Sequence, residues 1–407
     1  MMILKKGTFF NHFLALFLIC GSFICFKPYV ANAKNFNHNQ NCLTKDLSYY
    51  SSPRVKNKCQ SINGPCWSFA NIASLETTLN NNSLLENSLS EKHLLSWVNQ
   101  SLNKPGYHIP LKNGGAIQTA LAYFSSGIGP VFESDCPYNT IDTCFNSNLE
   151  NISPEYWVKG AKNVNTDINS IKQDISKYGA VTIVYNVNDQ LNHAVSAIGW
   201  DDKNKSWIVK DSAKTHNNYV NLPYSTKILT ATCFTDVEKF PANQKIHQLD
   251  PFGATANYGN DELLTVANVY DFDDNEKLHA VTINSSSENA KINLYLAPIL
   301  NNAPNKNKLS WTHLYSGSVP YDGYFTFTMK NNINLNKGKY AIIAQIEKTS
   351  ASKKPEIGCQ LPNDYLTSSP CSPGECFLQV GNEFWDITNI DQLKSIAGFS
   401  IKAITRY

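Results

Sequence analysis

The sequence predicts two folded domains, an α+β domain of about 200 residues followed by an all-β sandwich of about 160 residues. Two observations predict this division. Helical and strand-like patterns mix between residues 34 and 240, whereas helical periodicity is nearly absent between residues 246 and 407. The chain has 407 residues, 42% of them hydrophobic and 17% charged, which is typical of a folded protein with more than one core.

Residues 1–33 have the pattern of a secretory signal peptide. Lys5 and Lys6 give a positive start, Phe13 to Phe26 is an apolar run, and Ala31-Asn32-Ala33 offers small residues for cleavage. The apolar run is short for a transmembrane helix, and a retained N-terminal anchor is the alternative. We therefore expect a secreted protein, in a periplasm or outside the cell, with no membrane contact after signal removal.

Four segments of the first domain predict helices. The first runs from Pro65 to Leu79, and proline suits the first turn of a helix. Its residues at helical spacing are Phe69, Ile72, Ala73, Glu76 and Leu79. Ser90 is a plausible cap of the second helix, and the other two are expected near residues 117–124 and 171–178. Strand-like runs follow at residues 180–185, 194–200 and 206–209.

The second domain predicts strands throughout. Five runs alternate in polarity or are rich in β-branched and aromatic residues: 278–283, 292–296, 324–329, 340–346 and 399–407. Asn, Gly, Pro and Ser separate them. We expect an antiparallel β-sandwich. Trp311 and Trp385 are either core aromatics of this sandwich or a platform for stacking sugars.

The cysteines are informative because export places them in an oxidising compartment. Two of the eleven lie in the signal, so an odd number remains and at least one is unpaired. Cys136 and Cys144 predict a local disulfide across a turn. A loop-rich stretch holds three more cysteines, Cys359, Cys371 and Cys376. One pair among these three is expected, with the third reaching elsewhere, for instance to Cys233; their irregular spacing does not predict a zinc site.

Cys66 is the candidate nucleophile. It follows Pro65 at the start of the first predicted helix, where backbone N–H groups and the helix dipole favour a thiolate. Gln60 lies on the loop that leads into this helix, and its side-chain amide can donate to an oxyanion beside the Cys66 backbone N–H. The alternatives are an inert structural thiol and a plain loop glutamine.

His193 is the candidate general acid and base. It starts a strand, and the next strand ends at Asp211 after a turn at residues 201–205. If these strands form a hairpin, Asp211 returns to within about two residues of the level of His193. A carboxylate there would orient the imidazole and stabilise its charged form. The alternatives are that His193 is a structural histidine of the core and that Asp211 is a surface carboxylate.

Together these segments resemble the papain family of cysteine peptidases. The likeness covers roughly residues 46–239 and rests on Gln60, Cys66-Trp67, the turn Asn113-Gly114-Gly115 and the strand that begins Asn192-His193. It implies that Cys66 is the nucleophile, His193 its ion-pair partner, Gln60 the oxyanion donor and Asp211 the orienting residue. It also implies that Gly114 and Gly115 pair with the substrate backbone, with Trp67 and Asn192 as further substrate-binding residues.

The sequence departs from the family in three places. Asp211-Ser212-Ala213-Lys214 stands where the family has Asn-Ser-Trp-Gly, so we expect a more water-exposed histidine hydrogen bond and weakened catalysis. Asn63 and Lys112 replace a common disulfide pair, and Cys59 is expected to bridge to Cys42 instead. The short stretch between the signal and Cys66 leaves no room for the long inhibitory propeptide of lysosomal relatives.

The second domain is similar to the lectin-like β-domain that follows the peptidase in some bacterial papain-like proteins. The likeness rests on four segments: residues 249–253, 266–270, 276–278 and 335–340. Sugar binding does not follow from the shape of a fold.

We therefore expect a secreted, monomeric cysteine peptidase with a protein or peptide substrate. No cofactor or metal is expected, and the formal net charge of +2 predicts no nucleic-acid binding. Two alternatives stay open. One is a papain-like fold that has lost turnover and binds peptides, and the other is a glycan-binding surface protein in which the β-domain is the main actor.

Overall fold

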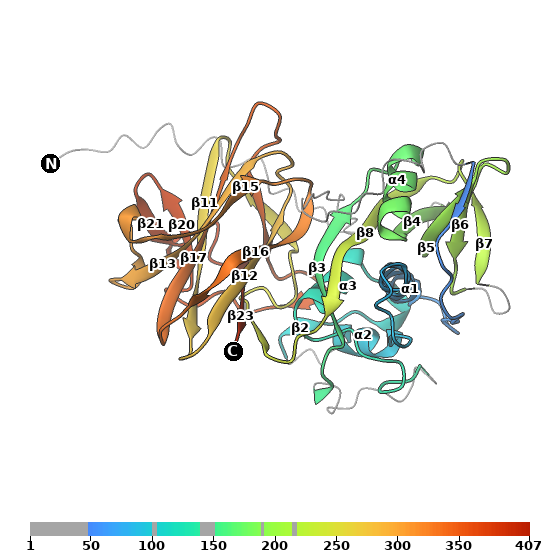
Figure 1. Ribbon diagram of the computed structural model, residues 1–407, viewed down its shortest axis with the longest axis horizontal. Coiled ribbons are helices and arrows are strands. Elements are labelled where there is room, and N and C mark those ends of the chain that lie inside the picture. The colour runs from blue at the N-terminus through green and yellow to red at the C-terminus, as the bar shows by residue number, and fades with distance from the viewer. Residues whose placement is uncertain (1–47, 100–103, 139–150, 189–190, 214–217) are drawn as a thin grey trace.

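The computed structural model describes residues 48–99, 104–138, 151–188, 191–213 and 218–407. The predicted signal peptide, Cys42 and Cys144 lie outside these ranges. Figure 1 shows an α+β domain beside a β-rich domain. Among the residues that the structure describes, no helix is both long and apolar enough to span a membrane.

Within its described residues, the first domain contains four α-helices and a short 3₁₀ helix. The helices are α1 (Cys66–Asn81), α2 (Glu91–Val98), η1 (Leu111–Asn113), α3 (Ile117–Ser125) and α4 (Ile168–Tyr178). Pro65 is the residue before α1, and the Ser90 hydroxyl accepts the backbone N–H of His93 at 3.1 Å, so the predicted cap of α2 is present. α4 begins three residues earlier than expected because Asp167 caps it, accepting the Ser170 N–H at 2.9 Å.

The strands of this domain are β1 (Tyr49–Ser51), β2 (Gly106–Tyr107), β3 (Tyr156–Asn163), β4 (Val181–Asn188), β5 (Leu191–Asp201), β6 (Ser206–Lys210), β7 (Tyr219–Pro223) and β8 (Ile228–Lys239). Three of them, β4, β5 and β8, pack against α1, which lies beside the sheet (Figure 1). β5 and β6 form the expected antiparallel hairpin, with Ser196 opposite Lys210. This register returns Asp211 to the neighbourhood of His193.

The second domain is built almost entirely of strands, as the sequence predicts. They are β9 (Gln244–His247), β10 (Ala256–Gly259), β11 (Leu263–Phe272), β12 (Lys277–Ser285), β13 (Lys291–Leu300), β14 (Ala303–Pro304), β15 (Thr312–Ser318), β16 (Gly323–Asn334), β17 (Gly338–Glu347), β18 (Glu356–Gln360), β19 (Leu366–Thr367), β20 (Cys376–Val380), β21 (Glu383–Asp386), β22 (Gly398–Phe399) and β23 (Ile401–Arg406). Short 3₁₀ helices occur at Lys308–Ser310 and Ile387–Asn389.

Two sheets of the β-domain enclose its core. One has the order β14-β13-β17-β11-β20-β21, with β15 beside β13. The other contains β16, β12, β23 and β9. Leu264, Val281, Phe325 and Ile342 of facing strands belong to the same buried cluster. Trp311 packs against Tyr295 in a second, smaller cluster, whereas Trp385 is 53% exposed.

The two domains share one continuous sheet, which the sequence did not predict. β3 of the first domain pairs with β16 of the second, with Tyr324 opposite Ala161, and this gives the order β7-β6-β5-β4-β8-β3-β16-β12-β23-β9. β19 also pairs with β2, with Leu366 opposite Tyr107. The Tyr107 hydroxyl donates to the Phe252 carbonyl at 2.8 Å. The β-domain is therefore fixed to the first domain by backbone pairing at two places.

The disulfides expected within the described residues are not formed. Cys233 is buried in the core of the first domain, whereas Cys359, Cys371 and Cys376 lie in the core of the second, so no bridge can join the two groups. Cys371 lies close enough to Cys376 to help raise the pKa of the Cys376 thiol, although burial is the larger cause. Cys59 is also a free thiol.

Candidate active site

Cys66 is the first residue of α1 and is half-buried at the helix N-terminus. The turn before it depends on Gly64, whose φ is +114°. A Cβ at this position would lie 2.1 Å from the Leu111 carbonyl oxygen. Gly64 therefore lets the loop that precedes Cys66 pack directly on the η1 turn, which leads into Gly114 and Gly115.

His193 lies on β5 next to Asp211, and Cys66 is near enough to affect the pKa of its imidazole. Its Nε2 atom is 2.8 Å from Oδ1 of Asp211, which leaves Nδ1 for the thiol. Burial lowers the pKa of His193, but hydrogen bonds with Asp211 and Cys66 outweigh it and raise that pKa to about 9. The geometry therefore favours an imidazolium beside the thiol at neutral pH.

Asp211 is held in place by its own neighbours. The Ala213 backbone N–H donates to Oδ1 at 2.9 Å, and the Asn218 side chain donates to the Asp211 carbonyl at 3.1 Å. The bond between His193 and Asp211 is largely shielded from water, because the two side chains are only 14% and 7% exposed. The Tyr185 ring packs against the imidazole in a T-shaped arrangement, with the ring centroids 5.7 Å apart.

Gln60 is buried on the loop before α1, and its amide orientation is fixed by Ser212. The Ser212 hydroxyl donates to Oε1 at 2.7 Å, so Nε2 must be on the other side, where it donates to the Ile62 carbonyl at 2.9 Å. The backbones also pair, since Gln60 N donates to Ser212 O at 3.1 Å. One amide hydrogen of Gln60 is left to approach an oxyanion next to Cys66.

Ser212 was named in the sequence only as part of a departure from the family pattern. Ser212 directly follows Asp211 in the chain, and this position is the signal that could have revealed its role. The segment that places Asp211 beside His193 also places the next residue beside the loop that carries Gln60. One short segment thus orients two candidate catalytic side chains, one through Asp211 and one through Ser212.

Replacing Gln60 by alanine is expected to lower kcat by about 10²- to 10³-fold with a small change in KM, because an oxyanion donor acts mainly in the transition state. Ser212→Ala should lower kcat by about 10-fold, since it removes one hydrogen bond that orients the amide. Steady-state kinetics check both, and the exposed Ser134→Ala is the matched control. A Ser212→Ala enzyme with raised KM and unchanged kcat would contradict this role.

The remaining predicted substrate-binding residues differ in how exposed they are. Gly114 has a φ of +76° and open space around its Cα. Gly115 packs on Trp67, because a Cβ at residue 115 would lie 2.4 Å from the indole Cε2. Trp67 is almost completely buried and can act on a substrate only through Gly115. Asn192 is exposed on β5 beside His193.

A buried charge cluster links α1 to the segments that carry Gln60 and Asp211, and one of its members could be noticed in the sequence. Glu76 falls on the buried face of α1, where a glutamate is unusual. Its carboxylate lies 2.9 Å from Lys58 and 3.9 Å from Lys210. Lys58 also contacts Glu91 of α2 at 2.9 Å. Lys58 precedes Gln60 by two residues and Lys210 precedes Asp211, so α1 anchors both segments.

These groups define a class of site. A thiol at a helix N-terminus, an imidazole held by a carboxylate and a side-chain amide donor form the constellation of a cysteine peptidase. Within the described ranges, no group of three or more His, Cys, Asp or Glu side chains is placed to hold a metal ion.

Comparison with protein families agrees with this class. Residues 46–222 match the papain family of cysteine proteases, and residues 246–405 match the lectin-like domain. The first domain is therefore a papain-family cysteine protease domain, and a lectin-like domain follows it in the chain.

Known proteins resemble one or both domains. The cysteine protease and lectin-like domains of Cwp84, a surface-layer-associated protein of Clostridium difficile, superpose with a TM-score of 0.81 at 27% identity over 93% of this chain and 91% of that one. The structure of clostridial Cwp84 after propeptide cleavage superposes with a TM-score of 0.81 at 28% identity. The match covers 88% of this chain and all of that one. A viral cathepsin of Epiphyas postvittana nucleopolyhedrovirus is 28% identical over 181 residues, 39% of this chain and 51% of the relative. The chain thus spans about half the length of that curated relative.

Proposed function

We propose that the protein is a secreted peptidase that hydrolyses peptide bonds through a Cys66 thiolate and a His193 imidazolium. The thiolate attacks the substrate carbonyl carbon, and the oxyanion that forms accepts hydrogen bonds from the Gln60 amide and the Cys66 backbone N–H. The imidazolium gives its proton to the leaving amine, and the first product departs. Neutral His193 then takes a proton from water, which attacks the thioester and releases the acid.

The observation that carries this proposal is the position of His193. Its imidazole hydrogen-bonds to the carboxylate of Asp211, and the thiol at the first residue of α1 lies close enough to raise the pKa of the imidazole. A core histidine would need neither a buried carboxylate nor a half-exposed thiol as partners. Asp211 in place of the family's asparagine still accepts from Nε2 at an ordinary distance, which favours turnover over a fold that only binds peptides.

We also propose that residues 1–33 direct export and are removed, that residues 34–240 form the peptidase domain, and that residues 246–407 form the lectin-like domain. Cwp84 is described as surface-layer associated, which supports a location outside the membrane for this chain as well. Proteins of the same cell surface are then the natural class of substrate.

A thiol-directed epoxide tests the function and its alternative together. We expect labelling of one thiol per chain, at Cys66, and loss of casein hydrolysis in proportion to labelling. Cys66→Ala should show neither labelling nor hydrolysis, while Cys59→Ala, which removes the neighbouring half-buried thiol, should keep both. Labelling at Cys66 without hydrolysis of any protein between about pH 5 and about pH 9 would favour a peptide-binding fold without turnover.

A further inference from the structure

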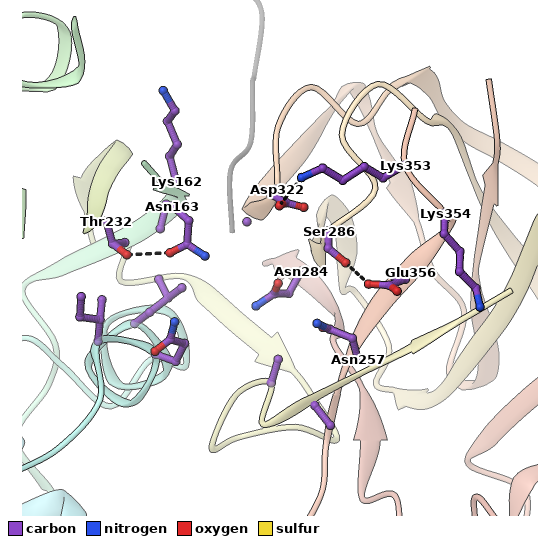
Figure 2. A pocket seen from close by; sticks show the side chains of 17 residues that line it. Lys162, Asn163, Thr232, Asn257, Asn284, Ser286, Asp322, Lys353, Lys354 and Glu356 are labelled. Carbon is purple, nitrogen blue, oxygen red and sulfur yellow. Dashed lines mark hydrogen bonds and ion pairs between the residues drawn. The ribbon is translucent and has the colours of Figure 1, made fainter. Parts of the chain in front are cut away.

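A cavity of about 410 Å³ lies between the two domains. The peptidase side contributes the first turn of α3, the end of β3 and Thr232 of β8. Figure 2 shows Asn163 and Thr232 on this side, facing Asn284, Ser286 and Asp322 of the lectin-like domain across the pocket. The pocket exists because β3 pairs with β16, which brings Asp322 next to the peptidase sheet.

The pocket and the candidate active site are linked by α3 and by the shared sheet. Its residues Ile117 and Gln118 follow Gly115 closely in the chain, and Gly115 packs on Trp67 next to the nucleophile. Across the sheet, β5 with His193 is separated from the pocket strand β3 by β4 and β8. Three strand spacings correspond to roughly 14 Å across the sheet. Thr232 is level with Thr182 and Ser196, three residues or about 10 Å along β5 from His193, so the separation is roughly 18 Å. An extended peptide covers this distance with about five residues.

Asp322 is an unusual group in this pocket. Its side chain is 8% exposed, and Lys353 lies 3.2 Å from Oδ2. Among the described residues, Oδ1 has no hydrogen-bond partner. Burial raises the pKa of Asp322, Lys353 lowers it, and repulsion by Glu288 and Glu356 raises it further. The resulting pKa is about 7. A buried carboxylate oxygen without a partner is costly unless a ligand supplies a donor.

The local charge balance favours a cationic ligand. The other two lysines that line the pocket already have carboxylate partners, Lys162 with Asp174 and Lys354 with Asp261. Lys353 is 63% exposed and is the one cation paired with Asp322 among the described residues. Glu356 and Glu288 therefore leave a negative excess around Asp322. The nearby amide and hydroxyl groups of Asn284 and Ser286 are suited to a hydrogen-bonding ligand.

We propose that this interdomain pocket receives a lysine or arginine side chain of the peptide substrate and that Asp322 of the lectin-like domain selects it. This inference rests on the proposed peptidase function and assigns to the second domain a part in substrate specificity. A cation bound at Oδ1 would satisfy the buried carboxylate and add a charge-assisted hydrogen bond. The lectin-like domain would then choose cleavage sites without touching the scissile bond.

Internally quenched peptides test this proposal on the mature full-length chain. A single lysine is moved through the positions on both sides of one cleavage site, with glutamine at the same position as reference. We expect one position, within about five residues of the scissile bond, where lysine raises kcat/KM by about 10- to 100-fold over glutamine. Asp322→Asn should lower kcat/KM for the lysine peptide to the value for the glutamine peptide.

Two further variants keep the test decisive. Lys353→Gln removes the cation that competes for Asp322, and Lys353 is exposed, so the change should not disturb the fold. We expect a larger lysine preference in this variant, and this result does not depend on whether Asp322→Asn folds. Asp391→Asn makes the same chemical change at an exposed ion pair outside the pocket and should change nothing. A wild-type enzyme without a lysine preference, or a preference that survives Asp322→Asn, overturns the proposal. If no peptide is cleaved at all, the peptidase function itself is overturned, and this inference falls with it.

Discussion

Replacing Asp211 by alanine is expected to lower kcat by about 10³- to 10⁴-fold while the protein stays folded. The carboxylate accepts from Nε2 of His193 at 2.8 Å, and this bond fixes the ring so that its other nitrogen meets the thiol. Without it the imidazole can rotate, and its charged form loses its partner. Circular dichroism and labelling of Cys66 would show that the fold and the thiol remain, and steady-state kinetics would show the loss of turnover.

The same change has a defined effect on the pH profile. Activity needs the imidazolium, which is lost as pH rises through the His193 pKa of about 9. Asp211 is one of the groups that raise this pKa, so its removal should move the alkaline limb to lower pH. Asp211→Asn keeps an oxygen that can accept from both Nε2 and the Ala213 N–H, so its loss of turnover should be mild. A shift confined to the acid limb would contradict this assignment of the Asp211 charge.

The sequence predicted the parts of this fold that depend on neighbours in the chain. Ser90 caps α2 because a hydroxyl before a helix satisfies a free N–H wherever the rest of the protein lies. The β5–β6 hairpin was predictable because a short turn forces adjacent strands to pair. This hairpin brings Asp211 to His193, so the main geometry of the candidate site came from local pattern and from the family resemblance.

Other features depend on contacts between distant residues and have no local signal. The β3–β16 pair joins Ala161 to Tyr324, and an edge strand gives no sign in its sequence of which other edge it will meet. The interdomain pocket with Asp322 follows from this pairing. The shielding of the His193–Asp211 bond also depends on a residue outside the β5–β6 hairpin, because Tyr185 on the neighbouring strand packs against the imidazole.

Glu76→Ala is expected to destabilise the peptidase domain by about 3–5 kcal/mol, because removing one partner of a buried ion pair leaves uncompensated charge. The Glu76 side chain is 1% exposed and lies between Lys58 and Lys210, which are 9% and 4% exposed. Its Oε1 also accepts the Leu89 N–H at 2.8 Å, so alanine removes a buried hydrogen bond as well. Chemical denaturation of the mature chain checks the free energy of unfolding.

The cluster should also matter for catalysis at temperatures where the variant is folded. Lys58 and Lys210 lead directly into the segments that carry Gln60 and Asp211, so loosening their common anchor on α1 should lower kcat more than it raises KM. Glu76→Gln keeps an acceptor for the Leu89 N–H. Its kcat and its free energy of unfolding should lie between those of Glu76→Ala and wild type. Glu86→Ala, at an exposed pair with Lys239, should change little. A Glu76→Ala enzyme that is destabilised but fully active when folded would show that the cluster holds the core together without positioning the two loops.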